Sequence, residues 1–256
     1  MPAKSAPGRC GPPGSNFPRR RFMSRPLASN AAAPPLEPAC MALMQQAAEW
    51  RLLALLLSGP RDGNWATQAE MLAREAGDAL LRQAVETAQS ESHENLYDSI
   101  FGPGGPAPPR EVSYRPATLA SNHLAELAAH YAAFNFTSSC DEPYDHVAVE
   151  TDFVAYLRFK QAFAVACGEV EMAEAAQAAA EYVVAEHLSY IAEPLAERLA
   201  SCGVNYLRLA AEALLVRAGR APVASMLPIL QDGAEAEFDF CADAETDGFD
   251  SLPLEV

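Results

Sequence analysis

The sequence lacks the features that mark membrane proteins, disulfide-stabilised proteins and most enzymes. Its apolar runs are short: Leu52 to Leu57 is far below the roughly 20 residues that span a bilayer, so no transmembrane helix is predicted. The six cysteines include no CxxC pair, so neither a zinc site of cysteines nor a disulfide framework is expected. GxSxG, HExxH and Walker-type sequences are also missing, so no common catalytic template predicts an enzyme.

Basic residues are scarce and unevenly placed. The chain carries 34 acidic and 18 basic residues, a formal net charge of −16. Several of the basic residues crowd the first 25 positions, and none follows Arg220. Because phosphate binding needs clustered Lys and Arg, this balance argues against a nucleic-acid partner and favours a cationic one.

The two ends of the chain have the composition of disordered tails. Residues 1–38 are rich in Pro, Ala, Gly, Ser and Arg, and residues 221–256 are acidic with no basic residue. Met41 opens the first apolar-periodic stretch, so Met41 or Met23 is an alternative start, with the preceding residues an extension. Arg19 to Ser24 resembles the twin-arginine export motif, but no apolar stretch follows it, which favours a solvated basic tail.

Between the tails, the apolar periodicity predicts an all-α fold, a compact multi-helix bundle without strands. The expected helices cover residues 42–58, 65–89, 116–136, 145–168, a following stretch to about 187, 189–200 and 205–218. Asp145 is expected to cap the helix that it begins, and Gly168 and Gly219 are expected to end theirs.

The histidines leave an alternative open. His123 and His130 lie two turns apart on one predicted helix, but a metal needs a third ligand that the sequence does not nominate, so no metal is expected. The alternative is an all-α metallohydrolase that uses Asp145 and His146 with His123, His130 or His187, and it predicts bound metal. A second alternative is a helical adaptor or accessory subunit that stays in a mature redox complex.

Two segments stand out, Leu96 to Tyr114 and Glu142 to Glu150. The first contains Gly102-Pro103-Gly104-Gly105, which superficially suggests a phosphate-binding loop. Pro103 and Pro106 lack the backbone N–H groups that would cradle phosphate, so a rigid connector is the better interpretation.

Together these segments resemble the cytoplasmic maturation chaperones of the TorD/DmsD/NarJ type, which serve molybdenum-containing redox enzymes. In that family a short aromatic-bearing helix leads into a Gly-Pro-Gly loop, followed by Pro-Pro, an acidic residue and Tyr. A later Pro-x-Asp-His turn has a Glu four residues after the His and a Phe beyond, matched here by Glu150 and Phe153. The resemblance covers Met41 to Arg220; Thr151-Asp152 replaces the usual apolar pair.

The resemblance implies a molecular chaperone without catalytic residues, metal or cofactor. It implies a helical part at 41–141 and another at 142–220, joined at the Pro-x-Asp-His turn. Such a chaperone, a cytoplasmic monomer or homodimer, binds the apo catalytic subunit of a molybdopterin oxidoreductase, commonly through its twin-arginine signal peptide. It assists cofactor insertion and assembly before export.

A receptor for a twin-arginine signal peptide needs an apolar groove with carboxylates at one end. Tyr97, Phe101 and Tyr114 are expected to wall this groove. The acidic side chains of both segments are expected to meet the guanidinium groups. The full set of expected client-binding residues is Tyr97, Asp98, Phe101, Gly102, Pro103, Gly104, Pro108, Pro109, Glu111, Tyr114, Glu142, Pro143, Asp145, His146, Glu150 and Phe153.

Overall fold

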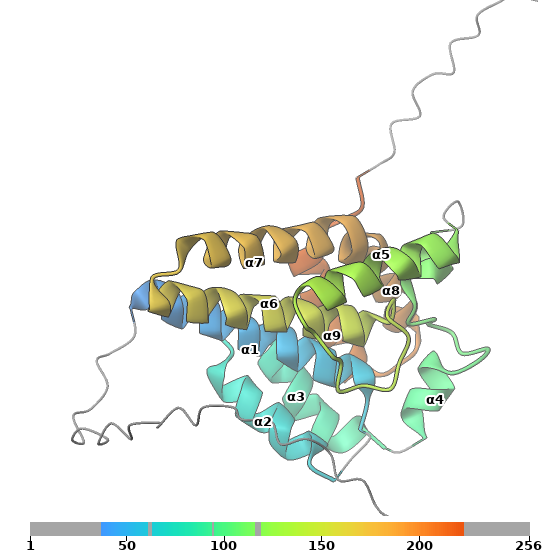
Figure 1. Ribbon diagram of the computed structural model, residues 1–256. Coiled ribbons are helices and arrows are strands. Elements are labelled where there is room, and N and C mark those ends of the chain that lie inside the picture. Colours follow the sequence, from blue (N-terminus) through green and yellow to red (C-terminus); the bar gives the residue numbers. More distant parts are fainter. Residues whose placement is uncertain (1–36, 61–62, 94, 116–118, 223–256) are drawn as a thin grey trace, which may run out of the picture. The chain divides into compact units, whose positions relative to one another are not determined.

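Two long helices pack along each other and build much of the core (Figure 1). In the computed structural model, α1 spans Pro38–Ser58 and α6 spans Val147–Cys167. All residues from Leu52 to Leu57 are buried, so this part of α1 is apolar on every side. A helix of that kind must be surrounded by other helices.

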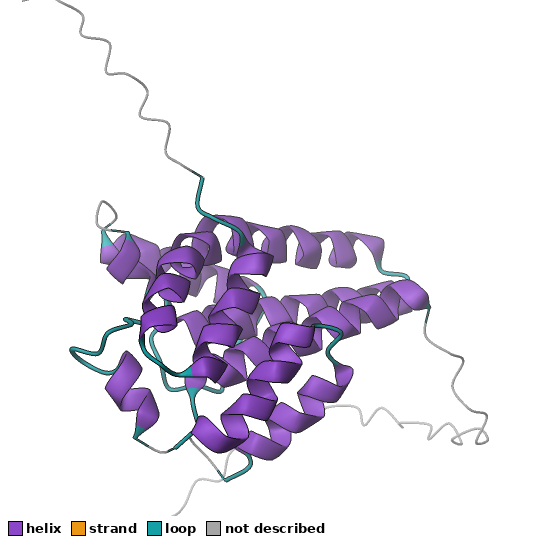
Figure 2. Ribbon diagram, turned by 180° about the vertical axis from the view of Figure 1, so that it is seen from behind, coloured by secondary structure: helices purple, strands orange, loops and turns teal. Residues whose placement is uncertain are grey.

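The structure describes residues 37–60, 63–93, 95–115 and 119–222. The predicted tails at 1–38 and 221–256 therefore lie almost entirely outside the described residues, as does the sequence that resembles the export motif. Within the described ranges, helices and loops account for the chain and no strand is formed, which confirms the all-α prediction (Figure 2). No helix found there is long and apolar enough to cross a membrane.

The other helices surround the α1–α6 pair. Their bounds are α2 Trp65–Glu75, α3 Ala79–Glu91, α4 Leu96–Phe101, the 3₁₀ turn η1 Glu111–Tyr114, α5 Ala120–Ala133, α7 Val170–Val183, the π turn η2 Val184–Leu188, α8 Ser189–Ser201 and α9 Asn205–Ala218. Helix α7 packs on α6, α2 packs on α1, and α9 packs on both α3 and α8 (Figure 1). Helices from the two predicted parts therefore share one core.

The predicted helix at 65–89 is wrong, because the chain forms α2 and α3 with a break between them. Asp78 causes the break. Its Oδ1 accepts hydrogen bonds from the backbone N–H groups of Leu80 at 2.6 Å and Leu81 at 3.4 Å. An aspartate in this role caps a new helix and so competes with continuation of the preceding one.

Asp145 was expected to cap α6, but His146 caps the helix instead. The His146 Nδ1 accepts a hydrogen bond from the backbone N–H of Ala148 at 3.1 Å. The predicted end of α6 is confirmed: Gly168 has φ 74° in the left-handed region that favours glycine.

Helices α7 and α8 are joined without the break that was expected between His187 and Ser189. The π turn η2 connects them. A π turn is closed by i→i+5 hydrogen bonds, whereas an α turn is closed by i→i+4 bonds, so a π turn changes the direction of the side chains that follow it. Such turns occur frequently at functional sites. It leaves His187 buried, with 1% of its surface exposed.

Candidate functional site

The Gly/Pro loop after α4 folds closely back onto that helix. The backbone N–H of Gly102 donates to the Asp98 carbonyl at 3.0 Å, and that of Ala107 donates to the Ile100 carbonyl at 3.2 Å. A Cβ atom on Gly105 would lie 2.4 Å from the Ile100 carbonyl oxygen, and one on Gly102 would lie 2.3 Å from that of Asp98. The loop therefore requires glycine at both positions and has a defined shape.

Replacing Gly105 with alanine tests this close approach. We expect Gly105→Ala to lower the free energy of unfolding by about 1 to 3 kcal/mol, because the new methyl group must displace a backbone carbonyl. Urea denaturation followed by circular dichroism measures the change. Gly63→Ala is the matched control, since a Cβ there meets nothing within 4 Å. Equal losses in the two variants would contradict the prediction.

The two segments singled out by sequence are held together by backbone hydrogen bonds. The N–H of Glu111 donates to the carbonyl of Asp145 at 2.8 Å, and the N–H of Val147 donates to the carbonyl of Pro109 at 2.9 Å. These bonds flank an antiparallel bridge between Arg110 and His146. Residues far apart in sequence therefore form one unit beside the start of α6.

The Asp145 side chain strengthens this junction. Its carboxylate is fully buried and accepts hydrogen bonds from Arg110 Nε at 2.9 Å and from the backbone N–H of Val112 at 3.4 Å. A buried carboxylate is stable only when it is paired in this way. Asp145 therefore joins the segment Glu142 to Glu150 to the segment Leu96 to Tyr114 from a buried position.

A chain of polar contacts leads from His146 to the surface. Because Nδ1 of His146 accepts from the backbone, the proton of the neutral ring lies on Nε2, which is 2.7 Å from the Tyr97 hydroxyl oxygen. The Tyr97 hydroxyl in turn donates to Oε1 of Glu142 at 3.2 Å. The cap of α6 thus fixes the position of an aromatic ring and a carboxylate.

A hollow of about 540 Å³ opens between the two segments, and we call it the motif hollow. Asp98 and Glu142 place carboxylates on its wall, while Tyr97 and Phe101 place aromatic rings there. Most of the residues that the sequence nominated line it. Its lining is Tyr97, Asp98, Phe101, Gly102, Pro103, Gly104, Gly105, Pro108, Pro109, Arg110, Ser113, Glu142, Pro143 and His146.

The remaining nominated residues lie behind the motif hollow. Tyr114 donates its hydroxyl to the Pro108 carbonyl at 2.7 Å, and burial raises the pKa of Tyr114 to about 12, so the hydroxyl stays neutral. Glu111, Glu150 and Phe153 are fully buried. Burial, together with the nearby carboxylates of Glu111 and Asp145, raises the pKa of Glu150 well above its usual range.

Sequence reasoning missed a second hollow, of about 620 Å³, which we call the apolar groove. Its lining is Met44, Ala47, Ala48, Arg51, Leu72, Asn135, Phe136, Thr137, Ser139, Asp152, Ala155, Tyr156 and Phe159. Met44 is 37% exposed and Phe159 is 49% exposed, although both are large and apolar. A signal was present in the sequence: Tyr156, Phe159 and Phe163 form a second aromatic stripe on α6, in addition to the buried one.

A smaller hollow of about 230 Å³ lies between the apolar groove and the motif hollow. It shares Arg51 and Ser139 with the apolar groove. Its Gly59 lies against Tyr97 of the motif hollow, so closely that a Cβ on Gly59 would be 2.7 Å from the Tyr97 ring. The smaller hollow therefore contacts both of the larger ones.

The fold and this site define the class of the protein: an all-α protein in which a shaped Gly/Pro loop, docked on an Asp-His turn, frames a surface hollow. The chain belongs to the family described as nitrate reductase delta subunit, whose model matches residues 63–196 and so includes both segments. No match to a curated protein was found.

This is the NarJ/TorD-type family of redox enzyme maturation chaperones, which confirms the resemblance drawn from the sequence. Its members are non-catalytic, cytoplasmic chaperones that serve the assembly of molybdoenzymes. The alternative of an all-α metallohydrolase does not fit this family.

Proposed function

We propose that this protein binds the apo catalytic subunit of a molybdopterin oxidoreductase through its twin-arginine signal peptide, and assists cofactor insertion and assembly before export. One observation carries the proposal: a hollow with two carboxylates on its wall is linked to an apolar groove through a smaller hollow that contacts both. A twin-arginine signal peptide has two arginines followed by an apolar segment. One surface therefore suits the arginines of the peptide, and the other suits its apolar segment.

The motif hollow is suited to the arginine end of the peptide. Asp98 is exposed, and Glu142 is half-buried beside the Tyr97 hydroxyl. Carboxylates bind guanidinium groups through paired, charge-assisted hydrogen bonds, and the half-buried ring of Tyr97 is suited to stack on a guanidinium plane. Because the Gly/Pro loop is already shaped, little conformational entropy is lost when it closes on a peptide.

The apolar groove is suited to the apolar segment that follows the arginines. Met44, Phe136, Tyr156 and Phe159 provide its apolar surface, and the flexible Met44 side chain can adapt to different sequences. Met71 is 61% exposed and lines a further hollow of about 340 Å³ next to Arg51. Covering these side chains removes apolar surface from water, which favours binding.

The buried members of the nominated set act by positioning the surface ones. Asp145 and Glu111 join the Gly/Pro loop to the Asp-His turn, and His146 holds Tyr97 and Glu142. Phe153 supports the same turn from within the core. We infer that the exposed residues contact the client and that these four residues fix the shape of its site.

Calorimetric titration tests the proposal. The full-length chain is titrated with synthetic twin-arginine signal peptides of molybdopterin oxidoreductases and with the same peptides carrying Gln in place of both arginines. We expect saturable one-to-one binding for at least one native peptide and a loss of at least about tenfold in affinity for its Gln version, about 1.4 kcal/mol.

Two other outcomes would change the proposal in different ways. Binding of an apo catalytic subunit that lacks its signal peptide, with no binding of any signal peptide, would move recognition to the mature part of the client. Co-purification with the cofactor-loaded mature enzyme would favour the accessory subunit that was the alternative from the sequence. Cytoplasmic localisation follows from the proposal, because cofactor insertion precedes export.

A further inference from the structure

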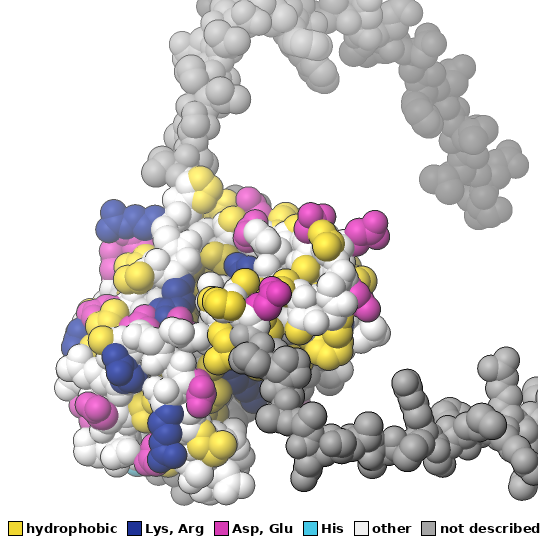
Figure 3. All heavy atoms as spheres, turned by 90° about the vertical axis from the view of Figure 1, so that its left-hand side faces the viewer, with side chains coloured by type: hydrophobic (Ala, Val, Ile, Leu, Met, Phe, Trp, Pro, Cys, Tyr) yellow, Lys and Arg dark blue, Asp and Glu magenta, His cyan; other side chains and the backbone are white. Residues whose placement is uncertain are grey.

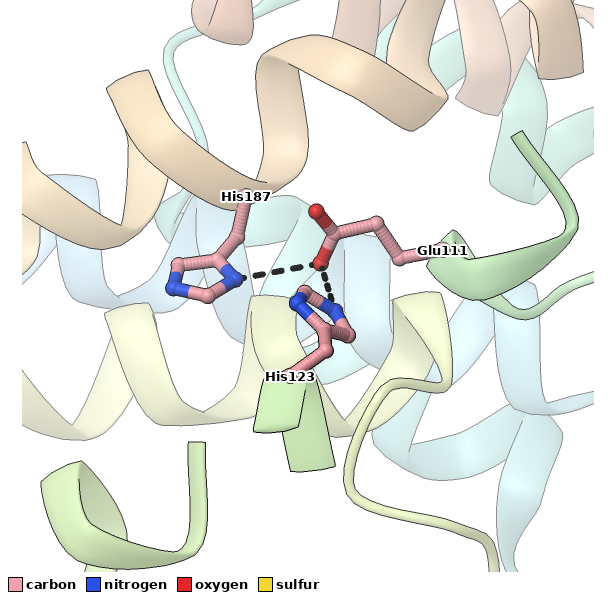
Figure 4. Close-up of side chains that lie close together, drawn as sticks. All are labelled: Glu111, His123 and His187. Atoms are coloured by element: carbon pink, nitrogen blue, oxygen red, sulfur yellow. Dashed lines mark hydrogen bonds and ion pairs between the residues drawn. The ribbon is translucent and has the colours of Figure 1, made fainter. Parts of the chain in front are cut away.

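Three side chains from separate parts of the chain converge at one buried point (Figure 4). Glu111 comes from η1, His123 from α5 and His187 from the π turn η2. Oε2 of Glu111 lies 2.7 Å from Nε2 of His123 and 3.1 Å from Nδ1 of His187. One potential ligand atom from each residue lies within 4.8 Å of the other two, and none of the three side chains is more than 1% exposed.

Hydrogen bonding within the cluster leaves buried polar atoms without partners. Even if both histidines donate to Glu111, Nδ1 of His123 and Nε2 of His187 remain buried with no hydrogen-bond partner among the described residues. The adjacent Glu150 is fully buried, and its carboxyl group meets that of Glu111 without a basic donor from the described part of the chain. Buried polar groups are nearly always satisfied, so this cluster requires an explanation.

Hydrogen-bond acceptors outnumber donors in this cluster, and a bound cation would compensate for the missing donors. Arg115 is a strong cationic partner of Glu111, since its Nη1 lies 2.7 Å from Oε1. That contact leaves Oε2 facing the two imidazoles. Glu150 adds a second carboxyl group, and within the described residues no cationic side chain forms an ion pair with it. Isolated buried carboxyl groups are costly unless they are protonated, paired or bound to metal.

We propose that Glu111, His123 and His187 bind a structural first-row divalent transition-metal ion, with Zn²⁺ as the reference ion. Two imidazole nitrogens and one carboxylate oxygen are ligands that Zn²⁺ accepts, and structural zinc sites are usually completed by a fourth protein ligand. Glu150, which adjoins Glu111, is the candidate for that position. The ion would tie η1, α5 and the α7–α8 junction to one another.

The surroundings of His187 support the assignment independently. The π turn places this side chain in the cluster, and π turns occur frequently at functional sites. Behind the ring, Nε2 of His187 lies 3.9 Å from Oε1 of Glu126, which also accepts a hydrogen bond from the Tyr182 hydroxyl. Metal-bound histidines commonly have a carboxylate behind the second ring nitrogen, where it orients the ring.

The sequence predicts no metal, because it nominates no third ligand beside His123 and His130. The structure pairs His123 with His187 instead, and it supplies Glu111 from a segment that was assigned to client binding. His130 stacks on Tyr182 with ring centroids 4.9 Å apart and is not part of the ligand group. The proposed metal site does not depend on which client the chaperone binds.

Metal titration of the full-length chain tests the proposal. After dialysis against EDTA, the protein is titrated with Zn²⁺ by calorimetry, and the bound metal is counted by elemental analysis. We expect one ion per chain, and a loss of at least about 100-fold in affinity for His123→Asn and for His187→Asn. His130→Asn, on the same helix as His123, is the matched control and should bind like the wild type.

Two measurements keep the test decisive if a variant folds poorly. Circular dichroism of the EDTA-treated variants shows whether their helical content is retained, and only variants that retain it are compared. Co²⁺ added to the wild-type chain should give the visible absorption of a tetrahedral nitrogen and oxygen site. Binding of less than one ion, the absence of that spectrum, or unchanged affinity in both folded ligand variants would overturn the proposal.

Discussion

The Phe153→Ala variant is expected to lose about 3 to 5 kcal/mol of free energy of unfolding. Phe153 is fully buried near the start of α6, where its ring meets Tyr131 at a centroid distance of 4.7 Å and Phe136 at 5.1 Å. Removing the ring leaves a cavity and also ends these edge-on aromatic contacts, which contribute beyond the buried area. Guanidinium denaturation followed by circular dichroism measures the loss.

Phe163→Ala is the matched control, because the same side chain is removed from the same helix. Unlike Phe153, Phe163 has 62% of its surface exposed. Its replacement should change the free energy of unfolding by no more than about 0.5 kcal/mol. A small loss for Phe153→Ala would show that the aromatic cluster under the Asp-His turn is not packed as described, and would remove the support proposed for the site.

The all-α fold and the rigidity of the Gly/Pro loop could be predicted from the sequence because local patterns determine them. Apolar residues at helical spacing define the buried faces, and Gly102 and Gly105 stand where a side chain would strike a carbonyl of α4. The end of α6 at Gly168 was predictable for the same reason, since a left-handed residue there favours glycine.

The errors arose where a side chain had several possible partners. Asp145 and His146 both have the chemistry of a helix cap, and only the docking of Arg110 onto Asp145 leaves the cap to His146. The break at Asp78 has the same origin, since an acidic side chain either continues a helix or caps the next one.

The convergence of residues that are far apart in the chain could not be predicted from a single sequence. Glu111, His123 and His187 are separated by more than ten residues at each step, and no periodic pattern relates them. The π turn that places His187 in the cluster has no signature in its Val-Ala-Glu-His-Leu sequence. The apolar groove was missed for a related reason: it combines side chains from α1, α2, α6 and the loop before α6.

The most informative change to the proposed peptide site reverses both carboxylates of the motif hollow. We expect the Asp98→Lys/Glu142→Lys double variant to bind a twin-arginine signal peptide at least about 100-fold more weakly than the wild type. A hydrogen bond to a charged group contributes about 1.5 to 3 kcal/mol, and a tenfold change in affinity corresponds to about 1.4 kcal/mol. Losing two such contacts therefore accounts for the effect even before repulsion between like charges is added.

The control must carry the same change in net charge, because the whole chain has a formal net charge of −16 and attracts cationic peptides in general. Glu171→Lys/Glu174→Lys meets this condition, since both glutamates are exposed on α7 and line neither the motif hollow nor the apolar groove. Long-range attraction is screened by salt within about 8 Å at physiological ionic strength, whereas direct ion pairs persist better. Titrations in 0.15 M salt, an ionic strength of about physiological value, should therefore separate the two variants. If both lose affinity equally, general charge attraction explains the binding, and the motif hollow is not the site of the arginines.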